Sequence, residues 1–425
     1  MASVPSRRGG GVFGYPGFTR LWLADSVKWL GFFGTGLAVQ LLLIDTLAAD
    51  QRDLGLARSA QWLPMLLFGL VVGVLVDRVP RRPVLVASDA VCALALAALC
   101  ALGAVGQLSV PLVAAGMFVV GAASMCSLTA HQSHVPRLVP VHDLPRANSR
   151  IEQAMTAAES VGPALAGLLV RTFSAPLAVG VSALAHAVSA LTVSTIRVDE
   201  PVPDAHRRGR VLADLVEGAR WVYGHRVLAP YAVALHVWFF FNSVALTVLV
   251  FYASTELGLG PAAIGVALAC AGVSGVVAAG ASPALAQRFG LGAVACVADW
   301  LTPVAVAVAA LAPAGGPGLA LLVVSQAIYG TASGLKGPLD LSYRNAVTPD
   351  RLRARMNGTI RSINYGTIVV SAPLGGWVAA TYGNRTALWL GVVGLCGAAL
   401  ILTLSPYRTA RLPEAGAEAP GHQGP

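Results

Sequence analysis

The fold is decided by the stretch LPMLLFGLVVGVLVDRVPRRPVLVASDAVCALALAALCAL, residues 63–102. It holds two long apolar runs, which are separated by a short segment with three arginines, Arg78, Arg81 and Arg82. A helix that crosses a bilayer needs roughly 20 mostly apolar residues, and both runs reach that length when their apolar flanks are included. They lack the ~10-residue alternating segments of a β-barrel. The stretch therefore predicts two transmembrane helices joined by a basic loop.

The whole chain repeats this composition. Of its 425 residues, 56% are hydrophobic and 12% are charged, and the mean hydropathy is +0.69. An average soluble domain carries roughly 25% charged residues, so a soluble fold of this length could not cover its surface with so few charges. The composition predicts an all-α membrane protein with many spans, and it excludes disordered, collagen-like and disulfide-rich chains.

Twelve apolar stretches are long enough to cross a bilayer, and glycine, proline and charged residues separate them. The first stretch is the least typical, because it contains Asp25 and Lys28. We expect the transmembrane helices at residues 19–45, 56–76, 84–105, 110–133, 150–170, 175–195, 229–253, 262–286, 291–312, 318–341, 360–381 and 386–404.

The placement of arginine tests the number of spans independently. Twelve spans put both termini on one side of the membrane, and 23 of the 27 arginines then fall on that side. The other four are Arg52, Arg58, Arg171 and Arg385. Because cytoplasmic loops carry the excess of basic residues, both termini are expected in the cytoplasm. The net charge of +9 is then a consequence of topology, and it gives no reason to expect a nucleic-acid partner.

The spans divide into two groups of six. A polar stretch at about 197–226 follows the sixth span, and its amphipathic segment is expected to dock on the membrane surface. The expected organisation is a cytoplasmic tail at 1–17, a six-helix bundle at 18–196, a cytoplasmic linker at 197–226, a second six-helix bundle at 227–405 and a cytoplasmic tail at 406–425.

A shift of 209 residues aligns the two halves. It pairs Arg146 with Arg355 and Gly167 with Gly376, at the same point of each half. Parallel repeats of six helices, related by an axis along the membrane normal, are an architecture of secondary transporters. Their substrate site lies between the halves, near the midplane of the bilayer. The repeat therefore favours a transporter.

The loop between the second and third spans carries a family motif. Residues 73–82 read GVLVDRVPRR. They resemble the signature of the major facilitator superfamily, Gly-x-Leu-x-Asp-Arg-x-Gly-Arg-Arg/Lys, with Pro80 in place of one glycine. Residues 63–69 and 162–167 are similar to the drug and siderophore exporter branch of that superfamily. The resemblance covers about residues 18–405.

The resemblance implies the major facilitator fold, with twelve transmembrane helices in two six-helix halves. It also implies a multi-pass protein of the bacterial plasma membrane that exports a small amphipathic compound, such as a drug, an antibiotic, a secondary metabolite or a siderophore. Such a protein works by alternating access.

The charges of the loop motif are expected to form a gate. Gly73 permits close helix contact. Asp77 stands at the C-terminal end of a helix, where the helix dipole disfavours an unpaired carboxylate, so it needs a positive partner. A charge network would hold one conformation and release in the other; the simpler alternative is that the arginines only keep the loop in the cytoplasm. The members of the motif are Gly73, Asp77, Arg78, Arg81, Arg82 and Asp89.

The fifth span contains GPALAG at residues 162–167, which resembles the antiporter motif Gly-Pro-x-x-Gly-Gly. Pro163 removes one helix hydrogen bond and bends the helix. Gly162 and Gly167 permit tight packing against a neighbouring helix. The alternative is a kinked helix that packs tightly and has no part in coupling.

The chain has no nucleotide-binding loop of the form GxxxxGK[S/T], since neither Lys28 nor Lys336 follows a glycine. It also has no GxSxG motif and no His, Cys and Asp cluster with metal-ligand spacing. We therefore expect a protein that is not an enzyme, holds no metal or cofactor, binds no ATP and uses a proton gradient as its energy source.

Ionisable residues inside a span are costly, so each is a candidate functional residue. Glu159 lies near the middle of the fifth span and is the first candidate to carry a proton; the alternative is a carboxyl that stays neutral or paired. Asp25 and Lys28 are three residues apart, and Lys336 and Asp340 are four apart. Each pair shares a helix face, so its members can neutralise each other or bind charged groups of a substrate.

Weaker candidates are Asp45, Asp299 and four histidines within or at the ends of spans. A histidine can relay protons near neutral pH, although a packed, hydrogen-bonded histidine is commoner. The histidines are His131, His134, His186 and His236.

The main expectation is a proton-coupled exporter that works as a monomer, with a small-molecule substrate, protons and the lipid bilayer as its partners. One alternative is an importer or facilitator of a nutrient, because a fold does not fix the direction of transport. Another is a membrane protein that does not transport.

Overall fold

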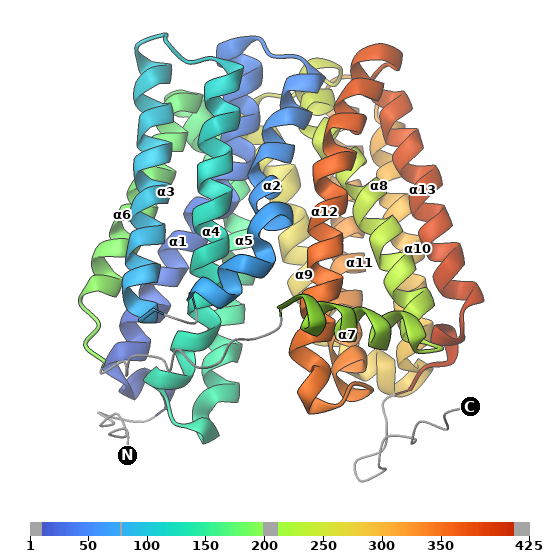
Figure 1. Ribbon diagram of the computed structural model, residues 1–425. Helices are drawn as coiled ribbons and strands as arrows, with labels where there is room; N and C mark the ends of the chain where they lie inside the picture. The colour runs from blue at the N-terminus through green and yellow to red at the C-terminus, as the bar shows by residue number, and fades with distance from the viewer. Residues whose placement is uncertain (1–10, 77–78, 199–210, 412–425) are drawn as a thin grey trace.

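The structure is a computed structural model that describes residues 11–76, 79–198 and 211–411. The long helices run side by side, and a shorter helix, α7 (Val211–Gly224), lies across one end of them (Figure 1). The long helices are α1 (Pro16–Leu41), α2 (Gln51–Val76), α3 (Arg81–Ala104), α4 (Val110–Leu138), α5 (Leu144–Thr172), α6 (Ala175–Ser194), α8 (Leu228–Thr255), α9 (Pro261–Phe289), α10 (Leu291–Ala310), α11 (Gly316–Ala346), α12 (Asp350–Tyr382) and α13 (Asn384–Leu404).

These twelve helices follow the predicted spans in order, so the predicted fold is confirmed for the part of the chain that the structure describes. The start of α1 and the end of α13 lie at the end of the bundle where α7 crosses it (Figure 1). We call this end the α7 end and the opposite one the far end. An even number of passes requires this arrangement.

Four helices continue past their predicted spans at the α7 end. α4 and α11 end five residues beyond their predicted spans, and α5 and α12 begin well before theirs. α4 and α11 occupy equivalent positions in the repeat, and so do α5 and α12. Hydropathy marks only the apolar part of a helix, whereas the backbone hydrogen bonds continue through polar residues.

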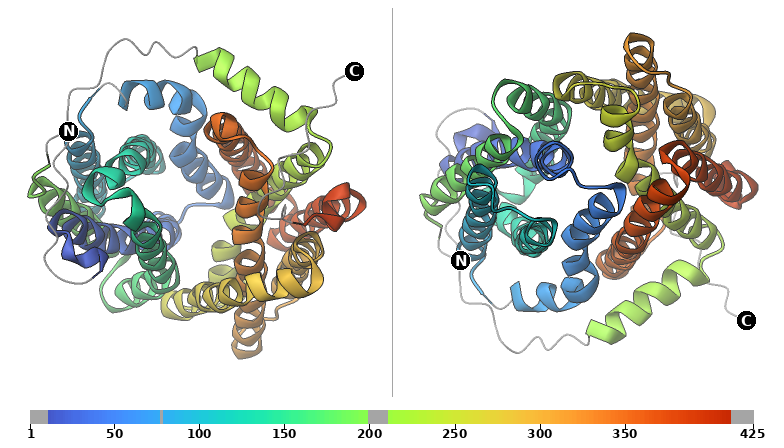
Figure 2. Two further views of the ribbon diagram at one scale, coloured as in Figure 1. Left: turned by 90° about the horizontal axis from the view of Figure 1, so that it is seen from below. Right: turned by 90° about the horizontal axis from the view of Figure 1, so that it is seen from above.

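Nine helices of the described ranges are long and apolar enough to cross a membrane by length and hydropathy alone. α5 and α12, which carry many polar and charged residues, are not among them. Both helices lie at the junction between α1–α6 and α8–α13, which we call the two halves (Figure 2).

The halves meet along two helix pairs, α2 with α12 and α5 with α9. Glycines let the backbones touch at the far end of both pairs. A Cβ atom built on Gly167 of α5 would lie 2.4 Å from the carbonyl oxygen of Pro261 on α9. A Cβ on Gly376 of α12 would lie 2.2 Å from the carbonyl oxygen of Gln51 on α2. Since Gly167 and Gly376 are related by the repeat, the two contacts are equivalent.

Hydrogen bonds reinforce the contact between α2 and the second half. The Gln51 side chain donates to the Asn384 side chain at 3.1 Å. The Ser59 hydroxyl donates to the carbonyl oxygen of Val369 at 2.7 Å. Both bonds lie between the far end and the middle of α2, so the halves are held together on that side.

The linker helix α7 packs against α12. Gly218 allows the approach, because a Cβ there would lie 2.9 Å from the carbonyl oxygen of Arg355. The Glu217 carboxylate accepts hydrogen bonds from the Arg351 and Arg355 guanidinium groups. The expected amphipathic segment thus has a protein partner in the second half.

Candidate functional site

A cavity of about 390 Å³ lies near the middle of the first half. Small-molecule sites have volumes of roughly 300–1,000 Å³. Helices α1–α6 all contribute to its wall, and Tyr365 of α12 adds a side chain from the second half. The cavity is therefore built mainly by the first half and reaches the junction between the halves at Tyr365.

Aromatic side chains form much of this wall. Trp29, Phe32 and Phe33 of α1 line it and pack against one another with ring centroids 5.5 to 6.0 Å apart. Trp62 of α2 stacks on Tyr365, with ring centroids 4.5 Å apart and an interplanar angle of 10°. This stacked pair joins the halves. Such a wall suits an apolar or aromatic ligand body.

A buried ionic group lies beside the aromatic wall. The Lys28 ammonium pairs with the Asp25 carboxylate at 2.9 Å, as their spacing suggested. The other oxygen of Asp25, which is fully buried, lies 2.6 Å from Nε2 of His131 on α4. Lys28 and His131 both line the cavity. The positive charge of Lys28 is therefore already compensated by Asp25 before a ligand enters the cavity.

Asp89, the innermost residue of the loop motif, also lines the cavity. Its carboxylate accepts a hydrogen bond of 2.6 Å from the Ser189 hydroxyl and lies 3.6 Å from Nδ1 of His186. Both partners belong to α6. The motif thus reaches from the α7 end of α3 to the wall of the cavity.

The rest of the motif lies at the α7 end. The Arg81 guanidinium donates to a backbone carbonyl of the loop at 2.9 Å. The Arg82 guanidinium donates to a backbone carbonyl at the end of α6. Asp77 and Arg78 lie outside the described residues, and so do the surroundings of Gly73. The gate therefore stays a prediction.

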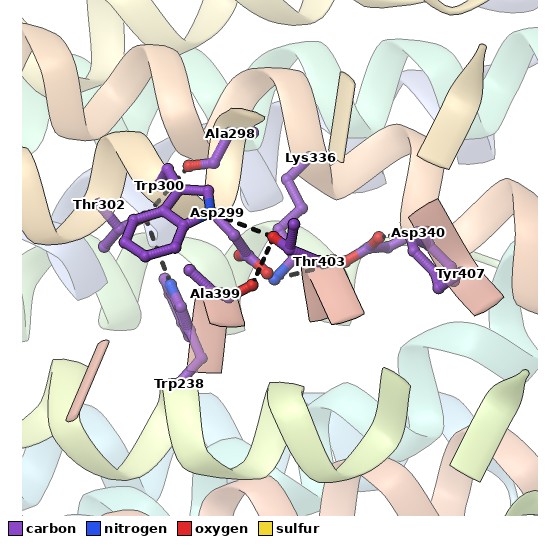
Figure 3. Close-up of polar contacts among 10 residues, drawn as sticks. All are labelled: Trp238, Ala298, Asp299, Trp300, Thr302, Lys336, Asp340, Ala399, Thr403 and Tyr407. Atoms are coloured by element: carbon purple, nitrogen blue, oxygen red, sulfur yellow. Dashed lines mark hydrogen bonds and ion pairs between the residues drawn. The ribbon is translucent and has the colours of Figure 1, made fainter. Parts of the chain in front are cut away.

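The second half holds its own buried ionic group (Figure 3). Lys336 of α11 pairs with Asp299 of α10, and its ammonium lies 3.9 Å from the Asp340 carboxylate. The Tyr407 hydroxyl donates to Asp340 at 2.7 Å. The Lys336 ammonium also lies 5.7 Å from the centroid of a Trp238 ring. Asp299, a weaker candidate from sequence, is thus the direct partner of Lys336.

Tyr407 lies beyond the last long helix, in a short 3₁₀ turn, Pro406–Thr409. Burial raises the pKa of its phenol well above the ordinary value of 10, and the Asp340 carboxylate adds to this effect. The phenol therefore stays protonated at physiological pH and acts as a hydrogen-bond donor. The C-terminal turn is anchored in this way to the charges of α10 and α11.

Glu159 of α5 lies one helical turn beyond Met155, which lines the cavity. Residues four apart share a helix face, so Glu159 faces the junction. Its carboxylate interacts electrostatically with the Tyr329 phenol on α11, in the opposite half. The side chain is exposed, and no basic side chain of the described residues pairs with it. An unpaired carboxyl at this depth can take up and release a proton.

The antiporter-like motif makes contacts on two sides of α5. A Cβ on Gly162 would lie 2.9 Å from the Cβ of Phe33 on α1. Gly167 meets α9, as described above, and the carbonyl oxygen of Pro163 would lie 2.6 Å from a Cβ on Gly265 of α9. The motif therefore joins α5 to its own half and to the other half.

Arg58 was not among the candidate site residues predicted from the sequence. The arginine distribution places it on the outer side, and in the structure it lies two turns from the far end of α2. It lines a small cavity of about 60 Å³ with Gln61 and Thr247, and its Nε atom is buried without a hydrogen-bond partner. Like Glu159, it interacts electrostatically with Tyr329. The signal was an arginine inside a predicted span.

Comparison with known proteins places this geometry among transporters. The family described as transmembrane secretion effector matches residues 13–420. The multidrug efflux pump Tap of Mycolicibacterium fortuitum is 27% identical over 337 residues, which cover 76% of this chain and 80% of that protein. The macrolide efflux protein A of Streptococcus pyogenes is 24% identical over 184 residues, which cover 43% of this chain and 44% of that protein.

A solved structure gives the same fold. The crystal structure of a mutant of the nucleoside transporter NupG superimposes with a TM-score of 0.74 at 14% identity. The match covers 91% of this chain and 99% of that chain. At this identity the likeness extends to the fold alone.

Proposed function

The chain belongs to the transmembrane secretion effector family of the major facilitator superfamily, and from this premise we propose that it exports a small amphipathic compound from the bacterial cytoplasm. The observation that carries the proposal is the aromatic cavity at the junction of the halves. Its wall combines Trp29, Trp62 and Tyr365 with the charged or titratable groups Lys28 and His131. An amphipathic compound needs both kinds of contact. The efflux pumps among the relatives support export as the direction.

The α7 end faces the cytoplasm in this proposal. The arginine asymmetry supports the orientation, because most arginines fall in segments at that end. The glycine contacts of Gly167 and Gly376 hold the far end closed, while the cavity lies on the α7 side of them. The described conformation therefore corresponds to a state that loads substrate from the cytoplasm.

A proton gradient supplies the energy, with no ATP and no cofactor, and one copy of the chain suffices. Glu159 is the proposed proton carrier, since it faces the junction and has no basic partner among the described residues. Proton binding at Glu159 would remove its charge while the substrate leaves on the outer side of the membrane. Two ion pairs would hold fixed charges near the path of the substrate, and in each pair the two charges compensate each other. They are Asp25 with Lys28 and Lys336 with Asp340.

Uptake into inside-out membrane vesicles tests the proposal. The cytoplasmic face of the membrane then faces the medium, so an exporter accumulates substrate inside. With an acidic vesicle interior, we expect a radiolabelled macrolide to accumulate above its external concentration. A protonophore should abolish this accumulation.

Vesicles from cells without the protein supply the baseline. An exposed carboxylate supplies a matched variant, Asp350→Asn, because Asp350 lies at the surface, where it pairs with Arg353. This variant should transport like the wild type. Accumulation that ignores the protonophore would refute proton coupling, and accumulation only in right-side-out vesicles would identify an importer.

A further inference from the structure

A second cavity, of about 240 Å³, lies in the second half toward the α7 end. It is lined by α8, α11 and α12, and its wall is far more polar than that of the aromatic cavity. Neither the loop motif nor the antiporter-like motif contributes to it. Its character is set by two arginines, Arg344 of α11 and Arg361 of α12.

These two arginines differ from their neighbours in the chain. Arg351 and Arg355 pair with Glu217, and Arg353 pairs with Asp350. Arg344 and Arg361 line the cavity instead, and neither has a carboxylate partner among the residues that the structure describes.

The Nε atom of Arg344 is buried without a hydrogen-bond partner. A buried donor without a partner costs free energy, so the cavity offers a place for an acceptor. Asn357, in the same wall, has a buried amide oxygen without a partner, and this oxygen would accept a hydrogen bond from a donor of the ligand.

One carboxylate, that of Asp340, belongs to the same wall. Its charge is already engaged, because Asp340 accepts a hydrogen bond from Tyr407 and lies 3.9 Å from the Lys336 ammonium. The two arginines therefore dominate the free charge of the cavity. Two guanidinium groups that converge on one space suit a carboxylate, sulfonate or phosphate, which they can bind through paired hydrogen bonds.

Tyr365 connects this cavity with the aromatic one, because it lines both. On one side it stacks on Trp62. On the other its ring lies edge-on to Phe239, with centroids 6.5 Å apart, and Phe239 lines the second cavity. Arg361 interacts electrostatically with the Tyr365 phenol. One ligand can thus contact both cavities across Tyr365.

We propose that the second cavity binds the acidic group of transported compounds that carry one, while their apolar body occupies the aromatic cavity. Amphipathic organic anions are then among the substrates, beside compounds without an acidic group, such as a macrolide, that the aromatic cavity holds alone. This proposal rests on the proposed function and adds the charge of the substrate to it. It also explains why Arg344 and Arg361 have no acidic partner in the ranges that the structure describes.

The test uses a matched pair of fluorescent probes with one aromatic body. Dansyl-glycine carries a carboxylate, and dansyl-glycinamide replaces it with a neutral amide. The purified full-length protein is placed in nanodiscs of neutral phosphatidylcholine, and binding is followed by energy transfer from tryptophan to dansyl. Trp29 and Trp62 in the cavity wall serve as donors. Empty nanodiscs give the background.

We expect dansyl-glycine to bind roughly tenfold more tightly than dansyl-glycinamide, because hydrogen bonds to charged groups are the stronger ones. Arg344→Gln and Arg361→Gln should each remove most of this difference and leave binding of the amide unchanged. Arg288→Gln is the matched control, since Arg288 is exposed at the end of α9. Phe33→Ala should weaken both probes equally.

Unchanged amide binding also verifies that each variant is folded. Equal affinities of the two probes for the wild type would overturn the proposal, and so would arginine variants that keep the preference. Neither result would affect the vesicle experiment, which tests export with a macrolide.

An acidic lipid headgroup has the same chemistry as the proposed ligand. Nanodiscs that contain phosphatidylglycerol distinguish the two sources. Unchanged binding of dansyl-glycine in these discs supports a transported compound as the ligand. Competition by phosphatidylglycerol that depends on Arg344 and Arg361 would overturn that assignment and identify a lipid site.

Discussion

Each half buries one lysine next to acidic side chains. Lys28 pairs with Asp25 in the first half, and Lys336 pairs with Asp299 in the second. A charge at bilayer depth persists only when it is paired or reaches water. The pairs therefore stabilise the fold mainly by cancelling each other's charge, and loss of one partner is more harmful than loss of both.

A double-mutant cycle in the first half should show this cancellation of charge. Lys28→Met leaves the buried Asp25 carboxylate without its lysine, and we expect a loss of roughly 3–5 kcal/mol in stability. Adding Asp25→Asn removes the unpaired charge and should recover most of that loss. The melting temperatures of the purified variants measure both effects. A single variant as stable as the wild type would contradict buried pairing.

His225, between α7 and α8, gives a prediction with a pH dependence. Its Nδ1 atom accepts hydrogen bonds from the backbone N–H groups of Val227 and Leu228, at 3.1 and 3.2 Å. Burial lowers the pKa of His225 below its ordinary value of 6.5. The neutral ring caps α8, so this contribution is complete above about pH 6.5 and is lost as the pH falls through the lower pKa of the folded state.

We therefore expect His225→Ala to destabilise the protein by about 1 kcal/mol at pH 7.5, a typical effect for a lost helix cap. The difference from the wild type should shrink at pH 5, because protonation of the His225 ring then removes the cap of α8 in the wild type as well. Thermal unfolding at the two pH values measures this. A difference that grows as the pH falls would mean that the charged ring is the stabilising form.

At the residue level, the sequence identified contacts within one helix better than contacts between helices. Asp25 and Lys28 were expected to meet because they are three residues apart on one helix. Asp299 and Lys336 meet through the packing of α10 on α11, which no local spacing encodes. Arg58 lies inside a predicted span, but its position in the sequence does not show that it lines a cavity with Gln61 and Thr247.

Among the elements, the two helix pairs that join the halves, α2 with α12 and α5 with α9, are expected to open and close the far end. Each pair brings backbones into contact through a glycine at the far end, Gly167 or Gly376. Alternating access requires these contacts to form and to break. A side chain added at either position should prevent closure of the far end without disturbing the helices themselves.

Gly376→Ala tests this role. A Cβ there would lie 2.2 Å from the carbonyl oxygen of Gln51, and such overpacking costs about 1–3 kcal/mol. We expect the far end to open more often. A cysteine at Ser59, which is buried against α12, should then react faster with an impermeant maleimide from outside the cell. The six native cysteines are replaced beforehand.

Gly397→Ala is the matched control, because a Cβ on Gly397 meets no atom within 4 Å. Its labelling rate should equal that of the parent protein. Equal labelling rates for Gly376→Ala and the parent protein would show that the far end tolerates the added methyl group. The contact of Gly376 with Gln51 would then have no role in closing the far end.

The elements themselves were largely predictable, since each apolar stretch is a local property of the sequence. The polar extensions of α5 and α12 were not predictable, because hydropathy marks only the part of a helix that lies in the lipid. The role of α7 depends on its contact with α12, and an amphipathic pattern alone does not distinguish a membrane surface from a protein surface.

For the molecule as a whole, two related halves enclose cavities of different character. The first half supplies the aromatic cavity and the second supplies the arginine-lined one, with Tyr365 between them. The repeat predicted a site between the halves. It could not predict that the two cavities differ, because the side chains that line them are not the same in the two halves. Glu159 lies at the same junction, beside Tyr329 of the second half, and we propose that it links substrate binding to a proton.

In the proposed mechanism, outward movement of substrate is exchanged for a proton through Glu159. Proteoliposomes that contain the purified protein and the pH dye pyranine test it most directly. A macrolide gradient is imposed across the membrane, and the internal pH is followed together with the macrolide. We predict proton movement opposite to the macrolide in the wild type. Glu159→Gln should abolish the pH change but retain exchange of labelled for unlabelled macrolide. Macrolide flux without proton movement in the wild type, or proton movement that survives Glu159→Gln, would contradict the account.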